Sequence, residues 1–122
     1  MSQGGPEDSA RPPPGVRLCA VDDLADPGTK GFRYRNASQM FAGFVVRKDD
    51  MIAGYVDSCP HAGWPLSITD DRYLTRSGHR LLCSGHGALF RPESGVCVAG
   101  PCTGQSLRPW PVTVRDGDIF TA

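Results

Sequence analysis

The sequence lacks long hydrophobic runs and an excess of charge of either sign. No apolar stretch approaches the roughly 18 residues that a membrane-spanning helix needs, and the N-terminal residues have neither the basic region nor the apolar region of a signal peptide. The 122 residues contain 13 Lys and Arg against 13 Asp and Glu, so the strongly basic surface of a nucleic-acid-binding protein is also missing. We therefore expect a cytoplasmic protein that binds neither membranes nor nucleic acids.

Cysteine is scarce. The five cysteines cannot all pair within one chain because their number is odd, and their density is below that of small disulfide-stabilised proteins. Cysteines that are not needed for disulfides are candidates for metal or redox chemistry.

Length and composition favour one small domain. Hydrophobic residues make up 39% of the 122 residues, which is enough for a single core. A chain of this length has no room for a large catalytic domain beside a small metal site.

Residues 1–15 differ from the rest of the chain in composition. Seven of them are Gly or Pro, and Ala10 is the one apolar side chain after Met1. Such a segment buries too little surface to offset the entropy lost on ordering. We expect a disordered tail over residues 1–15 and a folded domain over residues 16–122.

The folded part shows little helical periodicity. From Val16 onward, short apolar runs recur between turn residues, which predicts an all-β domain. One hairpin is predicted from residues 43–48 and 52–57, and a second joins 110–114 to 118–121 through Asp116-Gly117, a dipeptide typical of a tight type I′ turn. Shorter strands are predicted at 80–83, 89–91 and 96–98, and a brief helical turn at 22–25.

Two loops between the hairpins each combine a cysteine with a histidine. The first reads Cys59-Pro60-His61-Ala62-Gly63-Trp64-Pro65-Leu66, and the second reads Cys83-Ser84-Gly85-His86-Gly87-Ala88-Leu89-Phe90. Reduced to metal ligands, the pattern is C-x-H, 21 intervening residues, then C-x-x-H. Gly and Pro surround these residues and allow tight turns that direct backbone N–H groups toward an anionic centre.

Three interpretations of this pattern compete. Packed core cysteines are one, but two Cys-plus-His pairs in Gly- and Pro-rich loops make it the weakest. A structural zinc site is another, although such sites usually pair like ligands, as C-x₂₋₄-C and H-x₃₋₅-H. The third is a [2Fe-2S] centre with two Cys on one iron and two His on the other, the Rieske arrangement.

The two loops resemble the paired motifs of Rieske [2Fe-2S] proteins. The first is similar to that of the small Rieske-type ferredoxins of bacterial oxygenase systems. The resemblance implies one [2Fe-2S] cluster per chain, with Cys59 and Cys83 on the inner iron and His61 and His86 on the outer iron. It also implies a Rieske-type antiparallel β-sandwich or barrel base that carries a small cluster-binding subdomain of two loops, over about residues 58–104.

Within that resemblance, Gly100-Pro101-Cys102 is similar to the proline-containing loop that covers the cluster. The segment 67–82 between the two motifs is longer than is usual in this family.

The function that the resemblance implies is one-electron transfer. We expect a carrier that is not itself an enzyme, with a flavin-containing reductase upstream and an oxygenase or other redox enzyme downstream. Two alternatives are a small subunit of a nitrite reductase-like enzyme and a redox-sensing Rieske module. A sirohaem protein that copurifies with the chain would favour the first alternative.

The other cysteines and the third histidine have simpler interpretations. Cys97 and Cys102 are near enough in sequence for a disulfide, but two free thiols are favoured in a cytoplasmic protein. Cys19 lies in an apolar run and is expected in the core. His79 is expected in a solvated turn and not as a metal ligand.

Formal charges explain what this ligand set does to the reduction potential. Two ferric ions, two sulfides, two thiolates and two neutral imidazoles sum to zero, whereas four thiolates give minus two. The neutral centre accepts an electron more readily, so its potential rises from about −400 mV to between about −150 and +300 mV.

We predict a midpoint potential at the low end of that range. Respiratory Rieske proteins of high potential resemble this chain but have Ser and Tyr in place of Ala88 and Phe90, and those hydroxyl groups stabilise the reduced state by donating hydrogen bonds to sulfur. Ala88 and Phe90 donate none. A redox titration that gave a midpoint above about +100 mV would contradict the hydrogen-bond argument.

Overall fold

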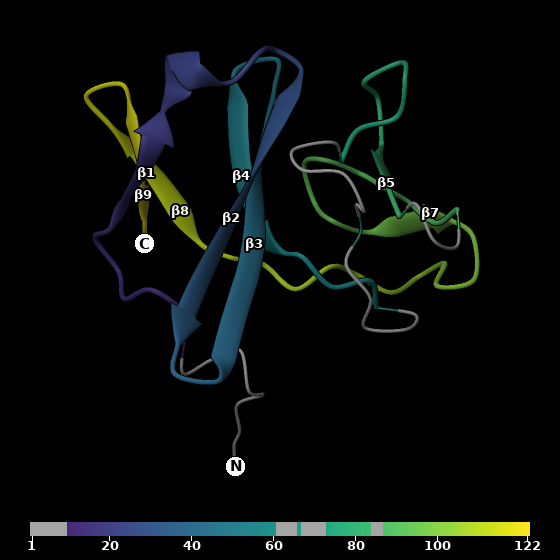
Figure 1. Cartoon of the computed structure of the whole chain (residues 1–122). Coiled ribbons are helices and arrows are strands. Elements are labelled where there is room, and N and C mark those ends of the chain that lie inside the picture. Colours follow the sequence, from purple (N-terminus) through teal and green to yellow (C-terminus); the bar gives the residue numbers. More distant parts are fainter. Residues whose placement is uncertain (1–9, 61–65, 67–72, 84–86) are drawn as a thin grey trace.

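The computed structural model describes residues 10–60, 66, 73–83 and 87–122. These residues form three antiparallel three-stranded sheets, in the strand orders β1-β9-β8, β2-β3-β4 and β5-β6-β7. The first two sheets form a base, and the third lies to one side of it, on the right in Figure 1. The expectation of an all-β antiparallel fold is confirmed.

The central sheet is built from β2 (Gly28–Asn36), β3 (Gln39–Lys48) and β4 (Met51–Val56). The first predicted hairpin is the β3–β4 pair, in continuous register from Gly43 opposite Val56 to Lys48 opposite Met51. Its turn residues Asp49 and Asp50 both have positive φ, 53° and 63°, which aspartate tolerates better than most residues.

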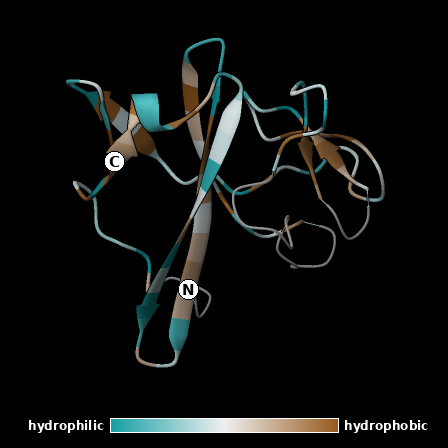
Figure 2. Ribbon diagram, turned by 45° about the horizontal axis from the view of Figure 1, so that its top comes forward, coloured by the Kyte–Doolittle hydropathy of each residue, from teal (hydrophilic) through white to brown (hydrophobic). Residues whose placement is uncertain are grey.

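β2 was not predicted from the sequence. It pairs with β3 over its whole length, yet none of its nine residues is fully buried. Hydrophilic residues recur along it (Figure 2). Because it is an edge strand, β2 needs little of the apolar alternation by which strands are recognised in a sequence.

The other base sheet joins the two ends of the described chain. It contains β1 (Arg17–Ala20), β8 (Val112–Arg115) and β9 (Asp118–Thr121), with β9 in the centre. The predicted second hairpin is confirmed as β8–β9. Its turn residues Asp116 and Gly117 have φ of 52° and 80°, the two positive values that a type I′ turn requires.

Trp110 connects the two base sheets. It is 2% exposed, its ring meets Phe41 edge to face at 5.0 Å between centroids, and its backbone N–H donates to Gly54 O at 2.9 Å. A Cβ on Gly54 would collide with the Trp110 carbonyl oxygen, so the absence of a side chain at Gly54 permits this contact.

The third sheet consists of β5 (Leu81–Leu82), β6 (Leu89–Phe90) and β7 (Cys97–Ala99). These strands fall where short strands were predicted, and each is two or three residues long. The predicted helical turn is a 3₁₀ helix at Val21–Asp23, one residue earlier than expected. No helix in the described part of the chain is long and apolar enough to cross a membrane.

Residues 10–15 lie against the base. Ala10 is 7% exposed and belongs to the core cluster of Trp110, and Pro13 O accepts a hydrogen bond from Thr121 Oγ1 at 2.7 Å. Residues 1–9 lie outside the described residues. The extent of the expected tail over residues 1–15 therefore stays a prediction.

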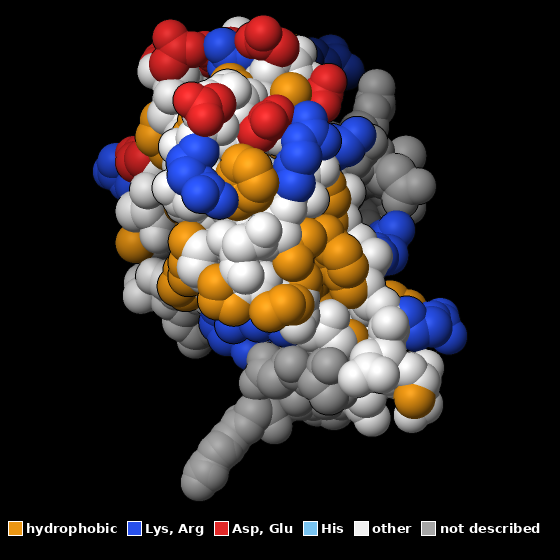
Figure 3. Space-filling view, turned by 90° about the vertical axis from the view of Figure 1, so that its left-hand side faces the viewer, with side chains coloured by type: hydrophobic (Ala, Val, Ile, Leu, Met, Phe, Trp, Pro, Cys, Tyr) orange, Lys and Arg blue, Asp and Glu red, His pale blue; other side chains and the backbone are white. Residues whose placement is uncertain are grey.

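Charged side chains gather at one end of the base. Figure 3 shows acidic and basic groups intermixed there. Arg17 pairs with Asp118, and Arg47 with Asp50, both at 2.9 Å. This mixture gives the end no single sign of charge.

Candidate metal centre

The first Cys/His loop begins just after β4. Cys59 is fully buried, and the loop ends at Leu66, which is also fully buried. His61 and Trp64 lie outside the described residues. The structure therefore places the start and the end of this loop, together with its cysteine.

A buried carboxylate holds the ends of this loop together. Asp57, which is 7% exposed, accepts hydrogen bonds from Leu66 N at 2.7 Å and from the Tyr73 hydroxyl at 2.9 Å. Burial raises the pKa of the Asp57 carboxyl, and the two hydrogen bonds act in the opposite direction. Asp57 thus links β4, the end of the first loop and the segment that follows it.

The second Cys/His loop connects β5 to β6. Leu82 pairs with Leu89 at its base, Cys83 N donates to Ala88 O at 2.9 Å, and Gly87 N donates to Cys83 O at 2.9 Å. Cys83 and Ala88 are both fully buried. His86 lies outside the described residues, so the structure places Cys83 and the closed ends of the loop.

Tyr73 connects the two loops. Its hydroxyl donates to Asp57 beside the first loop, and its backbone carbonyl accepts from Leu82 N, at 2.8 Å, immediately before Cys83. Its ring stacks on Phe44 of β3, with centroids 4.2 Å apart and planes 8° apart. The inter-motif segment, whose residues 67–72 lie outside the described chain, thus packs against both loops and the base through Tyr73.

Two cysteines of the predicted ligand set suit a metal site. All five cysteines lie in the described residues and none forms a disulfide. Cys59 and Cys83 come from different loops and belong to the same buried cluster. Two buried thiols presented from two loops fit the sulfur half of a mixed Cys and His ligand set.

Within the described ranges, no three His, Cys, Asp or Glu residues are grouped to hold a metal ion. Both predicted histidine ligands fall outside those ranges. The full set of four ligands therefore stays a prediction.

A third segment packs on the second loop. Gly100 has φ of 98°, and a Cβ there would lie 2.8 Å from Ala88 Cα, so a glycine permits the close approach. The neighbouring Cys102 is 1% exposed. Burial and hydrogen bonds to the Cys97 and Cys59 side chains raise the pKa of the Cys102 thiol to about 12.

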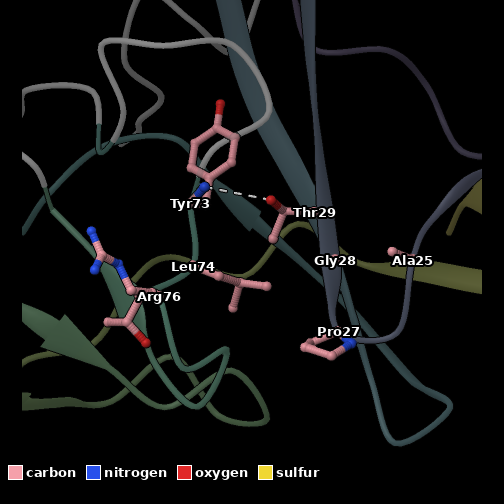
Figure 4. Close-up of a pocket in the computed structure, with 8 residues that line it drawn as sticks. Ala25, Pro27, Gly28, Thr29, Tyr73, Leu74 and Arg76 are labelled. Carbon is pink, nitrogen blue, oxygen red and sulfur yellow. Dashed lines mark hydrogen bonds between the residues drawn. The ribbon is translucent and has the colours of Figure 1, made fainter.

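A pocket of about 800 Å³ lies elsewhere, between the start of β2 and the segment after Tyr73 (Figure 4). Tyr73 N donates to Thr29 Oγ1 across its wall at 3.4 Å. Cys59 and Cys83 are not among the eight described residues that line it. The pocket is therefore separate from the two buried ligand candidates.

Comparison with known proteins identifies the family. Residues 15–114 match the model of the Rieske [2Fe-2S] domain. The chain belongs to the Rieske [2Fe-2S] family. It is 32% identical to the ferredoxin component of the p-cumate 2,3-dioxygenase system of Pseudomonas putida. The 105 aligned residues cover 86% of this chain and 82% of the relative.

Two solved structures of the same fold match this chain over nearly their whole length. The ferredoxin of carbazole 1,9a-dioxygenase from Nocardioides aromaticivorans IC177 gives a TM-score of 0.66 at 22% identity, over 90% of this chain and 98% of that chain. A chain from a complex of reduced oxygenase and oxidised ferredoxin in carbazole 1,9a-dioxygenase gives a TM-score of 0.65 at 24% identity, over 88% of this chain and 100% of that chain.

The expectation of a Rieske-type ferredoxin with one [2Fe-2S] cluster per chain is confirmed by the family and the Pseudomonas putida relative. The expectation that the chain is an electron-transfer component and not itself a catalyst is confirmed by the same relative.

Sequence reasoning missed Asp57 and Tyr73. One signal was present: Asp57 directly follows the apolar run of β4, and a carboxylate in such a position needs hydrogen-bond donors. The sequence did not identify those donors, because Tyr73 is 16 residues further along the chain.

We predict that Tyr73→Phe destabilises the fold and the metal centre together. The variant keeps the ring on Phe44 but removes one donor to a buried carboxylate, which costs about 1–3 kcal/mol. Denaturant unfolding should show this loss, and iron release to a chelator should become faster.

The matched control is Tyr34→Phe. Tyr34 also packs in the aromatic core, against Trp110, and its hydroxyl forms no hydrogen bond among the described residues. Equal stability and equal iron release in both variants would show that the Tyr73 hydroxyl does not hold the loops.

Proposed function

We propose that this ferredoxin carries single electrons to an oxygenase through a cluster bound by Cys59, His61, Cys83 and His86. The observation that carries the proposal is the pair of buried cysteines, Cys59 and Cys83, presented from two separately closed loops. A cluster-binding subdomain over about residues 58–104 would contain these loops and the third sheet.

The neighbouring side chains keep the centre apolar. Leu66, Ala88 and Phe90 are each fully buried and belong with Cys59 and Cys83 to one cluster of buried residues. When bound, the [2Fe-2S] cluster supplies a one-electron couple. Leu66, Ala88 and Phe90 bring no hydroxyl donor to the cysteine sulfur atoms, which favours the low-potential end of the Rieske range.

The oxygenase as acceptor is supported by the relatives. One is named as the ferredoxin component of a dioxygenase system, and a chain of the same fold comes from an oxygenase–ferredoxin complex. A flavin-containing reductase as donor follows from the one-electron role, since a flavin can pass on electrons one at a time. We also propose that the protein is located in the cytoplasm.

We predict that each of the four ligand candidates is needed for the Rieske spectrum. Cys59→Ser and Cys83→Ser should lose the cluster, while His61→Cys and His86→Cys should lower the potential or lose the cluster. Electron paramagnetic resonance of the dithionite-reduced protein, with iron and sulfide assays, measures both effects.

The chain offers matched controls in Cys19→Ser and His79→Gln. Cys19 is buried in a different core cluster, and His79 is exposed. Both variants should keep the wild-type spectrum. An unchanged spectrum in any of the four ligand variants would refute the assignment of that residue.

The role of carrier is tested by electron transfer to the purified oxygenase of a Rieske-type dioxygenase system. We expect the reduced ferredoxin to be reoxidised by that oxygenase in anaerobic stopped-flow mixing, with one electron delivered per chain. Failure of this transfer, together with stable copurification of a sirohaem protein, would contradict the carrier role. It would favour the alternative that the chain is the small subunit of a nitrite reductase-like enzyme.

A further inference from the structure

Cys97 and Cys102 form a pair of thiols that the proposed ligand set does not use. The Cys102 thiol donates to Cys97 Sγ at 2.9 Å, and Cys97 Sγ in turn lies 3.2 Å from Ala99 O. Both side chains are buried, at 2% and 1% exposure. A disulfide bond is about 2.05 Å long, so small side-chain rotations would bring the two sulfur atoms to bonding distance.

The backbone fixes both cysteines in this arrangement. Cys97 N donates to Gln105 O at 2.7 Å, and Gln105 N donates to Cys102 O at 2.8 Å. Gly104 N donates to Cys97 O at 3.1 Å. Each cysteine is therefore hydrogen-bonded to the segment Gly104–Gln105, and the two sulfur atoms face each other without any rearrangement of the turn.

The pair lies one residue below the surface. Cys102 stands between Pro101 and Thr103, which are both exposed, as is Val98 beside Cys97. A local opening of this turn would expose the sulfur atoms without unfolding the base. Such an opening would let a small reagent reach the pair.

Cys59 is the other cysteine near Cys102, since its side chain is among the groups that raise the pKa of the Cys102 thiol. A cysteine that ligates iron is not available to form a disulfide. With Cys59 bound to the cluster, Cys97 is the partner that remains for Cys102.

We propose that Cys97 and Cys102 form a reversible dithiol–disulfide site beside the cluster. The oxidant is a low-molecular-weight disulfide such as glutathione disulfide. Its S–S bond breaks, an S–S bond forms between Cys97 and Cys102, two electrons pass from the protein sulfurs to glutathione, and the two thiol protons end on two glutathione thiols. Through Gly100, which packs on Ala88, the disulfide would fix the turn over residues 97–102 against the loop that contains Cys83. The site does not depend on which protein accepts the electron.

The experiment equilibrates the holoprotein anaerobically with a series of glutathione redox buffers. Acid quenching and thiol alkylation follow, and mass spectrometry then maps the peptide that begins after Glu93 and contains both cysteines. We expect that peptide to lose two hydrogen atoms and both alkylation sites as the buffer becomes more oxidising, and to regain them in reduced glutathione. The visible spectrum, recorded in parallel, should show that the cluster is retained.

Serine variants test which two cysteines form the disulfide. Cys97→Ser and Cys102→Ser should each abolish the internal disulfide, whereas Cys19→Ser should leave it unchanged, because Cys19 lies in a separate core cluster on the base. Two thiols that stay fully alkylatable in every buffer would overturn the proposal. So would a disulfide between Cys102 and Cys59, or one that forms only after the iron has been lost.

Discussion

The arrangement of the two Cys/His loops depends on one buried carboxylate. Asp57 accepts hydrogen bonds from Leu66, at the end of the first loop, and from Tyr73, and Tyr73 accepts in turn from Leu82, next to Cys83. Two loops distant in sequence are thereby joined through a few hydrogen bonds in an apolar setting, where each bond is costly to lose. The large base sheets supply the platform on which Tyr73 stacks.

The short third sheet gains its stability from these connections more than from its own length. Its strands have two or three residues, and so few ladder hydrogen bonds do not hold a sheet alone. Fully buried Leu81 and Phe90 pack it into the same cluster as Phe44 of the base. An electron carrier benefits from this arrangement, because ligands that are held by packed supports keep their geometry.

Much of this organisation was predictable from local patterns. The β3–β4 and β8–β9 hairpins follow from apolar runs and turn residues, and Asp116-Gly117 has the backbone angles that its dipeptide predicted. Strand β2 was not predicted, because an edge strand stabilised by its neighbour needs little hydrophobic patterning of its own. The Cys97 and Cys102 pair was visible in the sequence, but the 2.9 Å between their sulfur atoms was not.

The sequence by itself determined the class of metal centre that we predict. Cysteine and histidine at fixed spacing, flanked by Gly and Pro, restrict the metal centres that the chain can hold, because ligand type and spacing are local properties. Only the tertiary structure decided how the two loops are held together and which thiols meet. Those features depend on contacts such as that of Asp57 with Tyr73, between residues that local periodicity does not relate.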